Sequence, residues 1–219
     1  MQQKHILKSF DNELSSLKSA LLAMLLTTSG QMKSVYLVIT NHDLELSKQV
    51  IKNDAKIDML HRTIVTDSVN ILSLRTPVAY DLRFVFSASH ISSNLERAGD
   101  NMRNIAKSVL QITKPKGEIT LKLLQMIKVI DDMLAETYRV LDKEDSKGLN
   151  AIIAKDIEVD KLNDEISNAL LNVIQKVSIV ELDTIRNYFL ICRSLERIGD
   201  HVVNTCKHIN FITSGEIIA

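Results

Sequence analysis

The sequence predicts an all-α protein of six long helices, arranged as three helices, a linker and three more helices. Three observations support this fold class. Only two prolines and six glycines occur among the 219 residues, whereas an all-β chain of this length needs many tight turns and uses more of both. Apolar residues recur at helical spacing along almost the whole chain. The two halves of the chain also resemble each other in sequence.

The first three helices are expected over residues 6–38, 46–75 and 77–109. The second of them shows the helical period clearly, because Leu46, Val50 and Ile57 fall on one face. It should end near Arg75, since the residue before a proline is pushed out of the α region. Pro77 then suits the first turn of the third helix.

A linker divides the chain near its middle. Pro115 and Gly117 stand two positions apart there, and together they break helical periodicity. Beyond them the apolar spacing predicts helices over residues 120–142, 145–177 and 180–213. We therefore expect a first domain over residues 1–113, a linker over 114–119 and a second domain over 120–219.

Two sequence motifs occur twice. Residues 95–104 read LERAGDNMRN and residues 195–204 read LERIGDHVVN, an offset of 100. Residues 53–60 read NDAKIDML and match residues 155–162, which read KDIEVDKL, at an offset of 102. One two-residue change in length explains both offsets, so an internal duplication is the simplest account.

Composition restricts the class of protein. The chain has 27 basic and 27 acidic residues and no net charge, so it lacks the broad basic field of most nucleic-acid-binding proteins. The longest stretch without a charged residue, Ser19 to Met32, is too short and too polar to span a bilayer. No signal peptide is evident, and two cysteines make no disulfide framework. These features predict a soluble cytoplasmic protein.

Four pairs of acidic residues lie at positions i and i+4, which share one face of a helix. They are Asp54/Asp58, Glu96/Asp100, Asp156/Asp160 and Glu196/Asp200. Some pairs at this spacing arise by chance in a chain with 27 acids, but these four occupy matching positions in the two repeats. On a helical wheel with Leu95 in the core, Glu96 and Asp100 lie on the side away from the core. A hard cation such as Mg²⁺, Ca²⁺, Mn²⁺ or iron is then expected at the surface, and a solvated acidic face is the alternative.

Each repeat also carries a glycine and an arginine beside its acids. Gly99 and Gly199 cost roughly 1 kcal/mol each inside a helix, which indicates a close approach between two helices, with room for a ligand as the alternative. Arg97 and Arg197 are expected to neutralise the acidic ridge, and the alternative is that they bind phosphate or a partner's carboxylate. The spacing is compatible with sites built within one half or between the two halves.

The sequence shows no catalytic nucleophile. It contains no Gly-rich phosphate loop, no Ser/His/Asp arrangement and no Cys pair at zinc spacing, and it lacks the Glu-x-x-His pattern of ferritin-like di-iron proteins. We therefore predict that the protein is not an enzyme. The alternative is a metal-dependent enzyme acting on a phosphate or carboxylate substrate, with His61 or His201 as the general base. Cys192 and Cys206 are expected to be small core residues.

Three motifs resemble the PhoU family of phosphate-uptake regulators: LERAGDNMRNIAK at 95–107, LERIGDHVVN at 195–204 and RTPVAYDLR at 75–83. With the two Asp-x-x-x-Asp helices, the resemblance extends over nearly the full chain. It implies two three-helix bundles packed side by side. It also implies metal ions (iron, zinc, manganese or magnesium) at the repeated acid motifs. The implied ligands are Asp54, Asp58, Glu96, Asp100, Asp156, Asp160, Glu196 and Asp200. Because Asn101 stands where the second repeat has His201, the two sites are not expected to be identical.

The resemblance also implies a role. PhoU-like proteins are negative regulators of the phosphate-starvation response, and they are understood to link the ATPase subunit of the phosphate transporter to a membrane sensor histidine kinase. The implied protein is a non-enzymatic adaptor that is cytoplasmic, peripheral to the membrane and commonly a homodimer.

Overall fold

A computed structural model of the chain describes residues 8–113, 115, 117–144, 146–174 and 179–216. Six α-helices contain most of these residues, a short 3₁₀ turn, η1 (Ser146–Gly148), precedes the fifth, and no strand occurs in the described part of the chain. The helices are α1 (Lys8–Asn41), α2 (Leu44–Arg75), α3 (Ala79–Val109), α4 (Gly117–Lys143), α5 (Leu149–Ile174) and α6 (Ile179–Ser214). The predicted all-α class and the six helices are confirmed.

The helix ends differ from the predictions by a few residues. The placement of Pro77 inside the third helix is wrong, because Thr76 ends α2 in the left-handed region at φ 44° and Val78 is extended as the N-cap of α3. Pro77 therefore lies in the turn between α2 and α3. The predicted helix ends at Ile6, Asp145 and Val177 lie outside the described residues, as do Lys114 and Lys116 of the predicted linker.

The start of α2 is set by a local cap. The Asp43 side chain accepts a hydrogen bond from the backbone N–H of Leu46 at 2.9 Å, which satisfies one of the free N–H groups that every helix start exposes. This cap therefore stabilises the start of α2 at Leu44.

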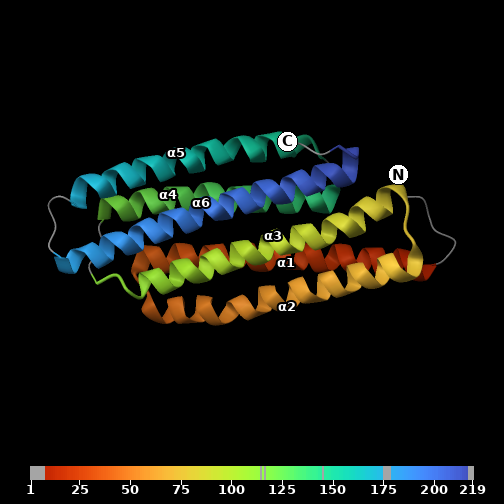
Figure 1. The fold of residues 1–219 in the computed structure, drawn as a ribbon, viewed down its shortest axis with the longest axis horizontal. Coiled ribbons are helices and arrows are strands. Elements are labelled where there is room, and N and C mark those ends of the chain that lie inside the picture. Colours follow the sequence, from red (N-terminus) through yellow and green to blue (C-terminus); the bar gives the residue numbers. More distant parts are fainter. Residues whose placement is uncertain (1–7, 114, 116, 145, 175–178, 217–219) are drawn as a thin grey trace.

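The six helices form two three-helix bundles that lie side by side (Figure 1). Helices α1, α2 and α3 contact one another, and so do α4, α5 and α6. Contacts between the bundles run from α3 to α6 and from α1 to α4, while α2 and α5 lie on the outer sides. The side-by-side arrangement implied by the family resemblance is confirmed.

One hydrophobic core extends through both bundles. Buried side chains such as Leu17, Met24 and Met102 of the first bundle belong to the same cluster as Ile130 and Leu195 of the second. By length and composition alone, α1 is the one described helix that is apolar enough to cross a membrane. In this fold α1 instead packs against α2, α3 and α4, so its apolar residues are used in the core.

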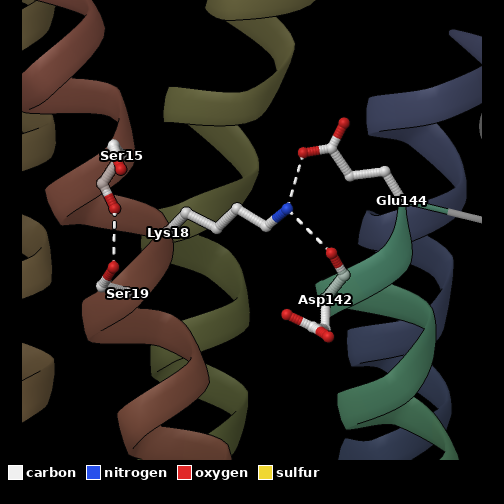
Figure 2. Close-up of polar contacts among 5 residues, drawn as sticks. All are labelled: Ser15, Lys18, Ser19, Asp142 and Glu144. Atoms are coloured by element: carbon white, nitrogen blue, oxygen red, sulfur yellow. Dashed lines mark hydrogen bonds and ion pairs between the residues drawn. The ribbon is translucent and has the colours of Figure 1, made fainter.

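A polar contact joins the bundles at one end of this interface (Figure 2). The Lys18 ammonium on α1 donates to the backbone oxygen of Asp142 at 2.9 Å and pairs with the Glu144 carboxylate at 2.7 Å. On the other pair of helices, the Arg83 guanidinium of α3 donates to the backbone oxygen of Ile212 in α6 at 3.2 Å. The bundles are therefore fixed to each other by apolar packing and by these polar contacts.

Candidate functional site

The four acid pairs come together in two groups, one in each bundle. The first acid cluster comprises Asp54 and Asp58 of α2 with Glu96 and Asp100 of α3. The second acid cluster comprises Asp156 and Asp160 of α5 with Glu196 and Asp200 of α6. Within each cluster the carboxylates of one helix lie close enough to raise the pKa of a carboxyl group on the other. Each cluster is thus built within one bundle, along the seam between its second and third helices.

A glycine on the third helix of each bundle permits this close approach. A Cβ atom on Gly99 would lie 3.1 Å from Oδ1 of Asp54 and 3.0 Å from Cδ1 of Ile57. A Cβ atom on Gly199 would lie only 2.6 Å from Oδ1 of Asp156. A Cβ contact under 3.0 Å is essentially never seen, and one of 3.0–3.4 Å is rare. The two glycines therefore let an aspartate from the neighbouring helix sit against the helix backbone. The prediction of a close approach between helices is confirmed.

The prediction that Glu96 and Asp100 lie on the side of their helix away from the core holds only in part, since both are half-buried. The prediction did not include Asp54, which is the deepest carboxylate. Asp54 is 2% exposed, and Asp156 is half-buried. The outer members differ between the clusters, since Asp58 and Asp100 are half-buried whereas Asp160 and Asp200 are exposed. Glu96 and Asp100 are more buried than the helical wheel predicts because the wheel considers α3 alone, whereas α2 packs against the flank of α3 that carries them.

An arginine supplies positive charge within the first acid cluster. The Arg103 guanidinium, on α3, donates one hydrogen bond to Oδ2 of Asp54 and forms an ion pair with Oδ1 of Asp100 at 2.6 Å. Oδ1 of Asp54 is buried and has no hydrogen-bond partner among the described residues. Burial raises the pKa of Asp54, and the charge of Arg103 opposes this effect only in part.

The second acid cluster has no such partner. Val203 occupies the position that corresponds to Arg103, and no lysine or arginine in the described part of the chain forms an ion pair with its four carboxylates. Burial, together with the charges of the other three acids, raises the pKa of Asp156 to about 6. For Glu196, Arg197 and Arg193 act in the opposite direction, but its pKa is still raised by burial.

The two arginines expected to neutralise the acids act on them without an ion pair. The charges of Arg97 and Arg197 lower the pKa of Glu96 and of Glu196, respectively, but both side chains are exposed and neither forms an ion pair within the described residues. Arg103 does so because it lies one helical turn beyond Asp100 on the flank that faces α2. Aligning the two repeats indicates that Arg103 is unusual, since the corresponding residue at the offset of 100 is Val203.

The two candidate histidines lie in different surroundings. His61 on α2 lies beside the first acid cluster, where its charge lowers the pKa of Glu96, and its Nδ1 is 3.1 Å from Oγ of Ser92. His201 on α6 is directed toward the other bundle, with its Nδ1 3.2 Å from Oδ1 of Asn94 on α3. Burial, followed by the charge of Arg97, lowers the pKa of His201. Each histidine is therefore near an acid cluster of its own bundle, since the charge of Asp200 raises the pKa of His201 against these two effects.

The two cysteines are buried, as expected. Cys192 donates from Sγ to Oδ1 of Asn163 at 3.0 Å, and Cys206 lies 3.4 Å from Oγ1 of Thr137. The pair formed by Cys192 and Asn163 corresponds to the pair formed by Ser92 and His61 in the first repeat.

The chemistry available at the clusters is that of carboxylate oxygen. No three His, Cys, Asp or Glu side chains of the described residues converge tightly enough to enclose a metal ion as they stand. Each cluster nevertheless presents hard oxygen donors from two helices, and in the second no described lysine or arginine forms an ion pair with them. Such a group attracts a hard cation or a basic side chain of another molecule.

Comparison with known protein families identifies the same duplication. The model of the PhoU domain matches residues 21–109 and again residues 123–209, so one copy falls on each bundle. Both copies include one complete acid cluster.

Curated relatives match over almost the full length. A phosphate-specific transport system accessory protein PhoU homolog of Zymomonas mobilis is 31% identical over 216 residues, which cover 97% of this chain and 90% of the relative. A homolog of the same name from Caulobacter vibrioides is 28% identical and covers 97% and 93% of the two chains.

Solved structures share the fold. The crystal structure of the phosphate transport system regulatory protein PhoU from Streptococcus pneumoniae superposes with a TM-score of 0.88 at 28% identity, covering 96% of this chain and 99% of that one. The crystal structure of PhoU from Pseudomonas aeruginosa gives a TM-score of 0.88 at 26% identity, covering 94% and 100%.

Proposed function

Because this chain belongs to the PhoU family, we propose that it is a regulatory accessory protein of phosphate transport. The observation that carries the proposal is the extent of the likeness. Both repeats match the PhoU domain, and the relatives named as accessory proteins of the phosphate-specific transport system align with 97% of this chain. A likeness confined to one bundle would support only a shared fold.

In this proposal the protein is a non-enzymatic adaptor on the cytoplasmic side of the membrane. It restrains phosphate uptake and the starvation response when phosphate is plentiful, by joining the ATPase subunit of the phosphate transporter to a membrane sensor histidine kinase. A homodimer would present both docking surfaces twice. The core shared by the two bundles supports such a role, because a rigid body holds two binding surfaces at a fixed separation.

The regulatory role can be tested in the organism that makes the protein. Deleting its coding sequence should raise expression of a phosphate-starvation reporter in phosphate-rich medium, and supplying the intact chain should restore repression. A pull-down with the transporter ATPase subunit and with the sensor kinase then tests the two contacts separately. A reporter that stays repressed in the deletion strain would contradict the proposal.

The proposal also includes metal binding at the two acid clusters, which the residues present would fit in chemical type. Oδ1 of Asp54 is buried without a partner among the described residues, and Asp156 lies against the backbone at Gly199. The donors are carboxylate oxygens, which bind magnesium, manganese and iron. A bound cation would supply positive charge that joins the two helices of a bundle.

Elemental analysis of the purified protein by mass spectrometry tests the metal proposal. Intact protein should carry iron, zinc, manganese or magnesium, and replacing Glu196 and Asp200 with Ala should lower the metal content while the helical circular dichroism signal is kept. Metal content that does not change in this variant would exclude the second acid cluster as the site.

A further inference from the structure

The two acid clusters share their four carboxylates but differ in whether a basic side chain forms an ion pair with them. At the offset of 100, Arg103 of the first repeat corresponds to Val203 of the second. Ala98 against Ile198 is an exchange between apolar residues, whereas Asn101 against His201 exchanges an amide for an imidazole. The exchange of Arg103 for Val203 therefore changes the charge within the seam.

The Arg103 guanidinium occupies the place that a cation would take between two helices. It contacts Asp54 on α2 and Asp100 on α3 at the same time. A divalent cation bound by carboxylates from both helices would neutralise the same oxygens. The side chain is also largely enclosed, since it is 31% exposed and its Nε is buried without a partner among the described residues.

We propose that Arg103 serves as a built-in counter-ion of the first acid cluster, so that divalent cations bind preferentially at the second acid cluster, where no described lysine or arginine forms an ion pair with the carboxylates. This inference rests on the metal binding included in the proposed function. Arg103 is fixed by the fold, so its charge is always present at the first cluster. An entering cation must displace the guanidinium or bind beside it, and either change costs binding free energy.

The second acid cluster presents the opposite case. Its four carboxylates repel one another, and no described lysine or arginine forms an ion pair with them. Arg197 and Arg193 attract Glu196 without such a pair, and its pKa is still raised. A divalent cation relieves this repulsion when it binds. Asp160 and Asp200 are exposed, so solvent and ions reach the cluster from outside the bundle.

The test uses the full chain, stripped of metal by a chelator and titrated with Mn²⁺, whose free form is counted by its electron paramagnetic resonance signal. Two matched double variants remove one cluster each: E96Q/D100N for the first and E196Q/D200N for the second. We expect tight Mn²⁺ binding to be kept in the first variant and lost in the second. Equal loss in both variants would overturn the inference and leave metal binding itself intact.

Exchanging the residue that differs tests the cause. V203R should weaken Mn²⁺ binding by about tenfold or more, which is the effect of one like charge placed beside a charged site, whereas Leu121→Arg on the exposed face of α4 should not. R103V should create a second binding event. If R103V does not fold, the test rests on V203R alone. Mn²⁺ binding to V203R that is as tight as binding to the intact protein would contradict the inference. Absence of Mn²⁺ binding by the intact chain would overturn both the metal proposal and this inference.

Discussion

The two acid clusters show how one motif can be built twice with different electrostatics. Both place an aspartate of the second helix against a glycine of the third, and both add three further carboxylates along the seam. The first cluster contains Arg103, which pairs with two of its acids. The second contains none, and the pKa of Asp156 rises to about 6 through burial and the neighbouring acids.

This difference shows that matching ligands do not make two sites equivalent. The charge that a cluster presents to a cation depends on every side chain in the seam, including one that is no ligand. Burial adds to the effect, because Asp54 is almost fully enclosed while the second cluster is more open. The following predictions test whether this single position accounts for the difference.

The largest effect is expected when the built-in counter-ion is removed. Replacing Arg103 with Val leaves the buried carboxylate of Asp54 unpaired, and breaking a buried ion pair in this way costs about 3 kcal/mol. The reverse change, V203R, should stabilise the metal-free protein by up to about 1 kcal/mol, since its pairs lie nearer the surface. Urea denaturation measures the free energy of unfolding of both variants. Loss of stability in V203R would show that the second cluster does not need a cation.

The next largest effect concerns the glycines, where the two clusters should respond differently to a methyl group. Gly99→Ala should destabilise the protein by about 2 kcal/mol, because Asp54 and Ile57 are buried and cannot move away. Gly199→Ala should be nearly neutral, although its nominal contact is shorter, because half-buried Asp156 can rotate toward solvent.

Gly30 provides the control for this pair. It lies within α1 and has no atom within 4 Å of an added Cβ, so Gly30→Ala should stabilise the protein by up to about 1 kcal/mol through helix propensity alone. Thermal unfolding followed by circular dichroism measures all three variants. A larger loss for Gly199→Ala than for Gly99→Ala would mean that the second seam is the more rigid one.

The dependence of stability on pH should also separate the clusters in the metal-free protein. Because the pKa of Asp156 in the folded state is about 6, above its ordinary value, the folded state binds the proton more tightly than the unfolded state. This carboxyl group therefore destabilises the fold above pH 6, and the penalty disappears as the pH falls toward 4. It amounts to about 1 to 2 kcal/mol after allowance for partial exposure.

The measurement compares intact protein with Asp156→Asn at pH 4 to 7, in the presence of a chelator. The variant should be more stable at pH 7 and should lose this advantage at low pH. His201 and His208 have lowered pKa values and act in the opposite direction, but they are present in both proteins and cancel in the difference. Parallel curves for the two proteins would show that Asp156 keeps its ordinary pKa.

Much of the fold could be predicted from the sequence because helical periodicity is a property of each segment alone. The six helices followed from apolar spacing, whereas the position of Pro77 did not, since it depends on the left-handed turn at Thr76. The acid pairs were found by their spacing and by the duplication. Their burial could not be predicted from one helix, because α2 covers the flank of α3 that carries Glu96 and Asp100.

The role of Arg103 is a separate case. No local pattern distinguishes it from Arg97, which lies two turns earlier on the same helix. Only the geometry of the seam shows which arginine reaches across to Asp54. The sequence nevertheless shows that the two repeats differ at this position. Comparing the two halves of a duplicated chain can therefore identify residues that make one site differ from the other.

The smallest effect is expected at the hydrogen bond that Cys192 makes in the second bundle. Cys192 donates to Asn163 in the second bundle, while Ser92 contacts His61 in the first. Cys192→Ser should therefore cost less than about 1 kcal/mol, because the hydroxyl group can donate to the same amide oxygen. Cys192→Val removes the donor and should cost about 1 kcal/mol more, since the amide oxygen then loses a partner.

Urea denaturation compares these two variants, and thiol titration of the native protein provides an independent check. Burial raises the pKa of Cys192 to about 12 and that of Cys206 to about 11, so neither thiol should react with a disulfide reagent at pH 8 until the protein unfolds. If Cys192→Ser proved as costly as Cys192→Val, the seams would differ in packing as well as in charge. Position 203 alone would then not explain why the second acid cluster differs from the first.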